Sequence, residues 1–131
     1  MNQIKARITA IKRSGEVSIV TFYVAEQVMR MMSLALAPEI EVGMHVTLGV
    51  KATSIMLAKG LQGEVSTSNQ LQVHVDRMEW GELLCSVRFL FDGVLLESVI
   101  TRASAEKMSL KEGDAVVALI KSSELSILEL L

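Results

Sequence analysis

Two stretches of the chain place an apolar side chain at every second position. They are residues 4–10 (IKARITA) and residues 71–76 (LQVHVD). A period of two is typical of a β-strand with one face buried and one exposed. Two further runs, VSIVTFYV and LLCSVRFLF, are rich in β-branched and aromatic residues and follow the turn signals Gly15-Glu16 and Gly81-Glu82. The pattern predicts a mainly β protein.

Turn and cap residues divide the rest of the chain into short elements. Asp92-Gly93 lies between apolar runs and predicts a two-residue hairpin. Ser104 can begin a short helix that Gly113 ends, and Pro38 and Gly43 bracket the corresponding segment earlier in the chain. A last strand is expected in each half, at residues 44–52 (MHVTLGVKA) and 114–122 (DAVVALIKS).

These elements occur twice, because the chain contains an internal repeat. The repeated residues are Asn2-Gln3-Ile4 with Asn69-Gln70-Leu71, Phe22 with Phe89, Gly43 with Gly113, Val46 with Val116 and Lys51 with Lys121. A polar link at residues 63–68 separates the copies. We therefore expect two modules, 1–65 and 66–131, each a small OB-like β-barrel with one short helix.

Composition adds an expectation about assembly and excludes several partners. Half of the 131 residues are apolar, but no run reaches the roughly 18 apolar residues of a membrane helix. A module this small buries little by itself, so we expect a homo-oligomer and no membrane partner. A net charge of −2 and few aromatic residues argue against nucleic acid as a partner.

The redox chemistry and the N-terminus favour the cytoplasm. Cys85 is the single cysteine, so no disulfide can form within the chain, and it is expected to be a small core residue. The first residues, MNQIKARITA, lack the apolar core of a signal peptide.

A lysine followed by small residues interrupts an apolar run in both modules, as Lys51-Ala52-Thr53-Ser54 and Lys121-Ser122-Ser123. One interpretation is that both lysines face solvent on an edge strand, where charge discourages aggregation. The other is that they bind a ligand. Hydroxyls, backbone N–H groups and a lysine are donors suited to a tetrahedral oxyanion. The candidate donors of this kind are Thr101, Ser104, Lys121, Ser122, Ser66, Ser68, Asn69 and Lys51.

At these residues the chain resembles a known family, the molybdate-binding Mop or TOBE domain. The matching pieces are Asn69-Gln70-Leu71, the Thr-x-x-Ser of residues 101–104, Leu110-Lys-Glu-Gly-Asp114, residues 120–123 (IKSS) and residues 51–58 (KATSIMLA). The resemblance covers nearly the whole chain as a tandem pair. No DNA-binding or ATPase region accompanies it, so the chain is most similar to the freestanding molbindins.

The resemblance implies an OB-like fold and molybdate or tungstate held where modules meet. It implies symmetric oligomers, such as a trimer of tandem pairs. It places Thr101, Ser104, Lys121 and Ser122 at oxyanion-binding positions, with no further cofactor. Module one departs from the pattern, because Met31-Met32-Ser33-Leu34 replaces the Thr-x-x-Ser and Ala52 replaces Ser122. Neither module has the arginine that often precedes the Asn. The implied role is intracellular storage, buffering or sensing of the anion.

Other functions compete with this interpretation. The run Val28-Met29-Arg30-Met31-Met32 offers soft ligands for copper(I), but it has no histidine or cysteine beside it. His45 and His74 occupy unrelated positions of the two modules, and no nucleophile and base form a catalytic pattern, so an enzyme is not expected. The main alternative is an OB-like protein-interaction or regulatory module that binds no anion.

Overall fold

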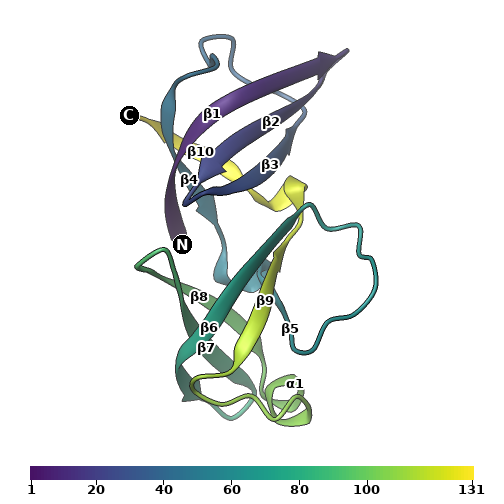
Figure 1. Ribbon diagram of the computed structural model, residues 1–131, viewed down its shortest axis with the longest axis vertical. Coiled ribbons are helices and arrows are strands. Elements are labelled where there is room, and N and C mark those ends of the chain that lie inside the picture. Colours follow the sequence, from purple (N-terminus) through teal and green to yellow (C-terminus); the bar gives the residue numbers. More distant parts are fainter.

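The computed structural model describes all of residues 1–131, and it consists of two lobes joined end to end (Figure 1). Each lobe contains one curled sheet of five strands. The strands are β1 (Asn2–Ser14), β2 (Val17–Val24), β3 (Gln27–Ser33), β4 (His45–Val50), β5 (Met56–Ala58), β6 (Asn69–Trp80), β7 (Leu84–Phe91), β8 (Val94–Thr101), β9 (Ala115–Ile120) and β10 (Ser126–Leu130). One α-helix, α1 (Arg102–Lys107), and two 3₁₀ turns, η1 (Ala52–Ser54) and η2 (Ser122–Glu124), complete the fold.

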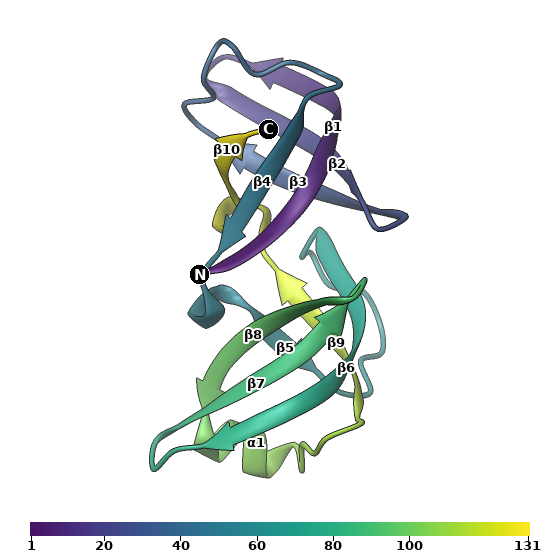
Figure 2. The same cartoon turned by 90° about the vertical axis from the view of Figure 1, so that its left-hand side faces the viewer.

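The two sheets exchange their last strands. One sheet has the order β10-β4-β1-β2-β3 and the other has the order β5-β9-β6-β7-β8. The short strand β5 therefore belongs to the first repeat in sequence but pairs with β9 of the second, and β10 crosses back to β4 (Figure 2). The expected mainly β, OB-like fold is confirmed. The modules predicted from the sequence are residues 1–65 and 66–131. Each lobe of the structure also includes one strand from the other repeat.

The alternating pattern behaves as expected at the start of each repeat. In β1 the side chains of Ile4, Ala6 and Ile8 are buried, and those of Lys5 and Arg7 are exposed. The strand β6 shows the same alternation. Burying one face of each strand is the main driving force for folding the two sheets.

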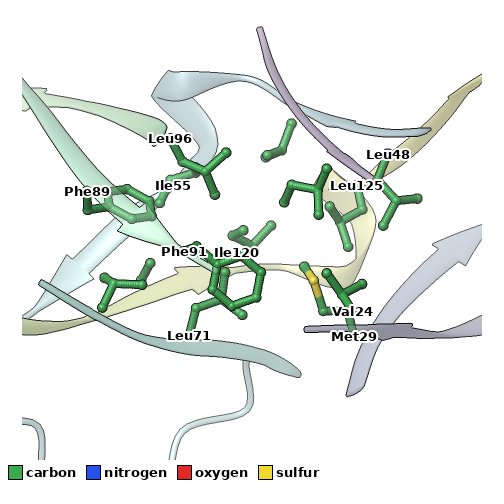
Figure 3. Close-up of a cluster of buried hydrophobic side chains, with 14 of the residues drawn as sticks. Val24, Met29, Leu48, Ile55, Leu71, Phe89, Phe91, Leu96, Ile120 and Leu125 are labelled. Atoms are coloured by element: carbon green, nitrogen blue, oxygen red, sulfur yellow. The ribbon is translucent and has the colours of Figure 1, made fainter. Parts of the chain in front are cut away.

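The buried faces of the two sheets form one continuous apolar core. A single cluster of 28 buried residues runs through both lobes. Figure 3 shows it, with Phe89, Leu96 and Ile120 on one side and Val24 and Leu48 on the other. Because the core does not stop at the lobe boundary, separating the lobes would expose apolar surface.

Two asparagines of equivalent position fasten the lobes together. The side-chain amide of Asn2 donates to the carbonyl of Glu97 and accepts from its N–H, both at 2.8 Å. Asn69 pairs in the same way with Arg30, accepting from its N–H at 2.7 Å and donating to its carbonyl at 2.9 Å. The side-chain amide of each asparagine thus pairs with the backbone N–H and C=O of one residue in the opposite repeat, as a neighbouring strand would. The two contacts are related by the internal repeat.

The structure corrects three details of the sequence interpretation. The segment between Pro38 and Gly43 forms turns and no helix, so the first repeat has no counterpart of α1. The strands expected at residues 44–52 and 114–122 end at Val50 and Ile120, because 3₁₀ turns begin at Ala52 and Ser122. Lys51 and Lys121 lie in extended conformation just after β4 and β9, at the start of the 3₁₀ turns, and neither lies within an edge strand.

Candidate oxyanion site

Lys121 lies between two cavities at the junction of the lobes. It follows the last residue of β9, so its backbone direction is set by the β9 pairing with β5 and β6. Its side chain lines both cavities. Lys121 therefore lies beside both groups of predicted donors, those of the one cavity and those of the other.

The smaller cavity, which we call the junction pocket, has a volume of about 290 Å³ and no apolar lining residue. Its lining consists of Ser66, Thr67, Ser68, Lys121 and Ser122. The three hydroxyl residues 66–68 come from the link before β6, and Lys121 and Ser122 come from the start of η2. The junction pocket therefore joins two of the polar clusters that the sequence predicted. It contains one positive charge and no carboxylate.

The larger cavity, which we call the helix pocket, has a volume of about 540 Å³ and lies between η1, the end of β8 and β9. Thr101, Ser104 and Lys121 line it together, as the sequence predicted. Thr53 and Ser54 also line it, although they come from the first repeat. Apolar residues such as Leu84 and Ile100 form much of its wall.

Thr101 has a structural role in the helix pocket. Its hydroxyl accepts a hydrogen bond from the Ser104 N–H at 3.1 Å and donates to the Ser104 hydroxyl at 2.8 Å. This is the usual arrangement at the first turn of a helix, where a side-chain oxygen satisfies a free N–H group. Ser104 still has its own hydroxyl proton to donate into the cavity.

A carboxylate also lines the helix pocket. Glu124 belongs to η2, and its Oε2 accepts a hydrogen bond from the Ser54 hydroxyl at 3.1 Å. Ser54 and Glu124 occupy equivalent positions of the two repeats, each three residues after the repeated lysine. The two 3₁₀ turns therefore meet at this contact. The helix pocket is lined by one carboxylate, of Glu124, and one ammonium group, of Lys121.

Two predicted donors lie outside both pockets. Asn69 is buried and its amide is fully used, because it also donates to the Ile120 carbonyl at 3.0 Å in addition to its two bonds with Arg30. Lys51 is exposed and lines no cavity in the chain. The structure thus brings together Thr101, Ser104 and Lys121 in one place and Ser66, Ser68, Lys121 and Ser122 in another.

The region of the first repeat that corresponds to the helix pocket is mostly apolar. A cavity of about 380 Å³ lies between β3, the loop after it and β10, with Met31, Met32, Leu36 and Ile40 in its wall. It contains no lysine or arginine. The sequence difference between the repeats therefore becomes a difference between the two cavities, because the helix pocket has one lysine and five hydroxyl residues, whereas this cavity has two serines, two glutamates and no lysine.

Thr53, Ser54, Thr67 and Glu124 line the pockets but were not among the candidate donors chosen from the sequence. Thr53 and Ser54 lie near Lys51 in sequence but reach the cavity of the other repeat, because the chain crosses between lobes at η1. Thr67 lies between two residues that were predicted, and it lines both pockets. Only Thr67 could have been added from its neighbours.

No group of three or more His, Cys, Asp or Glu side chains comes close enough to hold a metal ion. No helix is long and apolar enough to cross a membrane. Lys121 supplies the positive charge of both pockets. The candidate ligand is therefore an anion that hydroxyl groups and one ammonium group can bind.

The fold is that of a tandem OB-like protein, and comparison with solved structures supports this. The cytoplasmic molybdate-binding protein ModG superimposes with a TM-score of 0.87 over 96% of this chain and 94% of its own, at 24% identity. A molybdate-binding protein from Sporomusa ovata matches with a TM-score of 0.50 and 28% identity. That match covers 51% of this chain and 100% of the smaller protein, as expected if the whole of that chain corresponds to one of the two modules here.

The resemblance to the Mop and TOBE family is confirmed. Residues 65–127 match the family described as TOBE domain, so the match falls on the second half of the chain. Part of the chain is also similar to the molybdenum import ATP-binding protein ModC of Brucella abortus (strain 2308), at 39% identity over 80 residues. The match covers 60% of this chain, and the chain spans 22% of the length of that relative.

Proposed function

We propose that this protein binds molybdate or tungstate reversibly, and that the junction pocket is the binding site. The observation that carries the proposal is the lining of this pocket by four hydroxyl residues and one lysine, with no apolar or acidic side chain. The molybdate-binding proteins of the same fold support the choice of ligand. No covalent chemistry is required, so we propose a binding protein and not an enzyme.

The donors of the junction pocket suit a tetrahedral dianion. Lys121 supplies a positive charge, and Ser66, Ser68 and Ser122 supply hydroxyl protons that can rotate toward the ligand's oxygens. Hydrogen bonds to a charged acceptor are about twice as strong as neutral ones. Removing a dianion from water is costly unless several such bonds replace its hydration shell, so the donors must act together.

Anion size provides the basis for selectivity. Molybdate and tungstate are larger than sulfate, so donors placed for the larger anion leave longer and weaker bonds to the smaller one. Molybdate and tungstate are nearly the same size and shape, and the hydroxyls of this pocket offer no feature that separates them. We therefore propose one site for both anions, with a role in storing, buffering or sensing them in the cytoplasm.

We further propose that the chain acts as a homo-oligomer, for which a trimer of tandem pairs is the arrangement we favour. Large apolar side chains are exposed at several places on the single chain, among them Leu34, Leu83, Leu84 and Leu131. Exposed apolar groups of this number indicate a surface that another molecule covers. Light scattering on the purified protein would give the subunit number directly.

Thermal unfolding with four anions tests the proposed site. A ligand at one hundred times its dissociation constant stabilises the folded state by roughly 2.7 kcal/mol per site. We expect molybdate and tungstate to raise the melting temperature at matched ionic strength, and sulfate and phosphate to have little effect. Lys121→Ala should abolish the rise, whereas Lys12→Ala, which removes an exposed lysine that does not line the junction pocket, should retain it.

Two outcomes would contradict this proposal. An equal response to all four anions would indicate general screening of charge. No response to any anion would favour the alternative function, a protein-interaction module whose exposed apolar residues contact a partner. Lys51→Ala extends the test to the first repeat, and we expect it to leave the response intact because Lys51 lines no cavity.

A further inference from the structure

We propose that the chain has a separate site for a small zwitterion with an apolar body, the class to which the apolar α-amino acids belong. The site is a cavity of about 510 Å³, which we call the hairpin pocket, between strands β1 and β4 of the first lobe and the β7–β8 hairpin of the second. Its polar lining residues are Gln3, Lys5, Thr47 and Asp92. The hairpin pocket shares no lining residue with the junction pocket or the helix pocket.

Thr47 brings to this pocket a hydroxyl that the protein itself leaves without a partner. Only 7% of the residue's surface is exposed, and its side chain lines the pocket and makes no hydrogen bond within the chain. Polar groups buried to this extent normally have a hydrogen-bond partner. An unpartnered hydroxyl beside a cavity therefore indicates that another molecule supplies the partner.

Lys5 and Asp92 bring one charge of each sign to the same cavity. They come from opposite repeats, and neither forms an ion pair with the other or with any residue of the chain. Asp92 would repel a simple anion and Lys5 would repel a simple cation, whereas a zwitterion satisfies both charges. An α-amino acid has a carboxylate that can bind Lys5 and an ammonium group that can bind Asp92.

The remaining wall of the hairpin pocket suits an apolar body. Five of the nine lining residues are apolar, among them Val24, Phe91 and Val94. A mostly apolar lining with a few polar groups is typical of small-molecule sites, and such sites have volumes of roughly 300–1,000 Å³. The hairpin pocket falls within this range, so an amino acid with an apolar side chain fits its lining.

The polar groups are held on rigid elements. Lys5 stands directly opposite Thr47 in the antiparallel pairing of β1 with β4. Asp92 lies in the two-residue turn of the β7–β8 hairpin, with a φ of 51°. The hairpin is fastened to the first lobe by the two hydrogen bonds between Asn2 and Glu97, both at 2.8 Å. A site whose groups are positioned in advance loses less entropy when a ligand binds.

The internal repeat shows that the fold itself does not require these three polar side chains. The equivalent positions are uncharged and have no hydroxyl: Gln72 for Lys5, Val117 for Thr47 and Ala25 for Asp92. Gln72 and Val117 line a cavity that has no charged residue. The same strands therefore form with and without the charges and the hydroxyl, and only the hairpin pocket combines them.

Calorimetric titration of the full chain with L-leucine tests the inference. We expect one leucine to bind per chain. Two analogues should bind at least about tenfold more weakly, because each leaves one charge of the pocket unpaired. They are 4-methylpentanoate, which is leucine without its amino group, and 3-methylbutylamine, which is leucine without its carboxylate. If leucine does not bind, or if either analogue binds equally well, the inference is wrong.

Conservative substitutions locate the bound leucine. Lys5→Gln and Thr47→Val each introduce the residue of the second repeat, and Asp92→Asn retains a residue that suits the hairpin turn. Each should weaken leucine binding about tenfold. Lys12→Gln and Asp76→Asn are the matched controls, since they remove exposed charges that do not line the pocket, and they should leave binding unchanged. Unchanged binding in the first three variants would overturn the inference.

The inference is independent of the proposed oxyanion site, and one further comparison separates the two. Leucine binding should persist in Lys121→Ala and in the presence of molybdate, because Lys121 does not line the hairpin pocket. Loss of leucine binding in Lys121→Ala would place leucine in the junction pocket or the helix pocket and would overturn the inference. Loss of molybdate binding in any protein that still binds leucine concerns the proposed function alone.

Discussion

Asn69 holds the main chain of Arg30 in both directions, with its side-chain oxygen 2.7 Å from the Arg30 nitrogen and its side-chain nitrogen 2.9 Å from the Arg30 oxygen. The contact joins the first strand of one repeat to the third strand of the other. Asn2 repeats the arrangement on Glu97. A residue that the sequence placed among the oxyanion donors therefore has its amide fully used by the protein.

Replacing Asn69 should destabilise the protein more than replacing Asn2. Asn69→Ala removes three side-chain hydrogen bonds, two part-buried ones to Arg30 and a buried one to the Ile120 carbonyl, whereas Asn2→Ala removes two part-buried ones. An unsatisfied buried polar group costs about 1–3 kcal/mol. Urea unfolding of both variants would measure the difference. If Asn69→Ala unfolds at the same urea concentration as the wild type, the asparagine contacts do not fasten the lobes.

Gly49 controls how the last strand packs on the first lobe. A Cβ atom at Gly49 would stand 2.6 Å from Leu128 Cδ1, and Leu128 lies at the bulge where β10 pairs with β4. Gly49→Ala forces Leu128 to move, so we expect a loss of about 1 kcal/mol in the free energy of unfolding. Gly49→Leu should displace β10 and cost several times more.

A double-mutant cycle identifies the cause of that loss. In a Leu128→Ala background the neighbouring side chain is absent, so Gly49→Ala should become nearly neutral. Equal costs in both backgrounds would show that the Gly49 backbone, and not the contact with Leu128, explains the effect.

The two equivalent hairpin turns differ in how well their residues suit the backbone. Ala25 and Glu26 have positive φ angles of 50° and 63°, and Asp92 and Gly93 have 51° and 74°. Two positive φ angles define a turn that favours Asn or Asp followed by Gly. We expect Ala25→Asn with Glu26→Gly to stabilise the protein by about 1 kcal/mol.

The reciprocal change serves as the control for that turn. Asp92→Ala with Gly93→Glu should destabilise the protein by a similar amount, since it places the less suitable pair in the same backbone turn. Thermal or urea unfolding would measure both variants. A loss of stability in the first variant would mean that Ala25 and Glu26 make contacts that outweigh the backbone strain.

Lys59 links the exchanged strand to the second lobe, and the link should depend on pH. Its ammonium donates to the carbonyls of Met108 and Ser109 and lies 3.0 Å from Asp114 Oδ2. The hydrogen bond from Lys59 is the main reason why the pKa of Asp114 is lowered. A lowered pKa adds stability that is present above the unfolded value of about 3.9 and is lost as pH falls through the folded value.

Asp114→Asn should therefore lose stability at neutral pH and little in strong acid. The measurement is the unfolding midpoint of the wild type and the variant from pH 7 down to about pH 2. The two curves should converge at the acid end, where Asp114 is protonated in both states. Parallel curves over the whole range would show that the ion pair does not contribute.

The thiol of Cys85 should react slowly in the native protein. Burial raises its pKa, and the nearby charge of Arg102 lowers it by less. Since the thiolate is the reactive form and the side chain is buried, labelling by a thiol reagent should await unfolding. Rapid labelling of the folded protein would mean that β7 opens locally.

The sequence by itself predicted the repeat, the mainly β fold and the polar clusters of the site. The alternation in residues 4–10 and 71–76 was sufficient for two strands, because one buried face imposes a period of two. Asp92-Gly93 was sufficient for a hairpin, because few other residues accept its backbone angles. The segment between Pro38 and Gly43 showed the limit of such signals, since a possible start and end do not make a helix without a face to bury.

Only the tertiary structure decided which residues meet. The chain crosses between lobes at η1 and η2, so Ser54 reaches a cavity of the second repeat and contacts Glu124, 70 residues away. The same crossing buries Asn69 against Arg30 and leaves Lys51 outside both pockets. Local patterns reflect the neighbours of a residue along the chain. Strand exchange is a choice between two similar sheet edges, and it depends on packing between residues such as Gly49 and Leu128 that are distant in sequence.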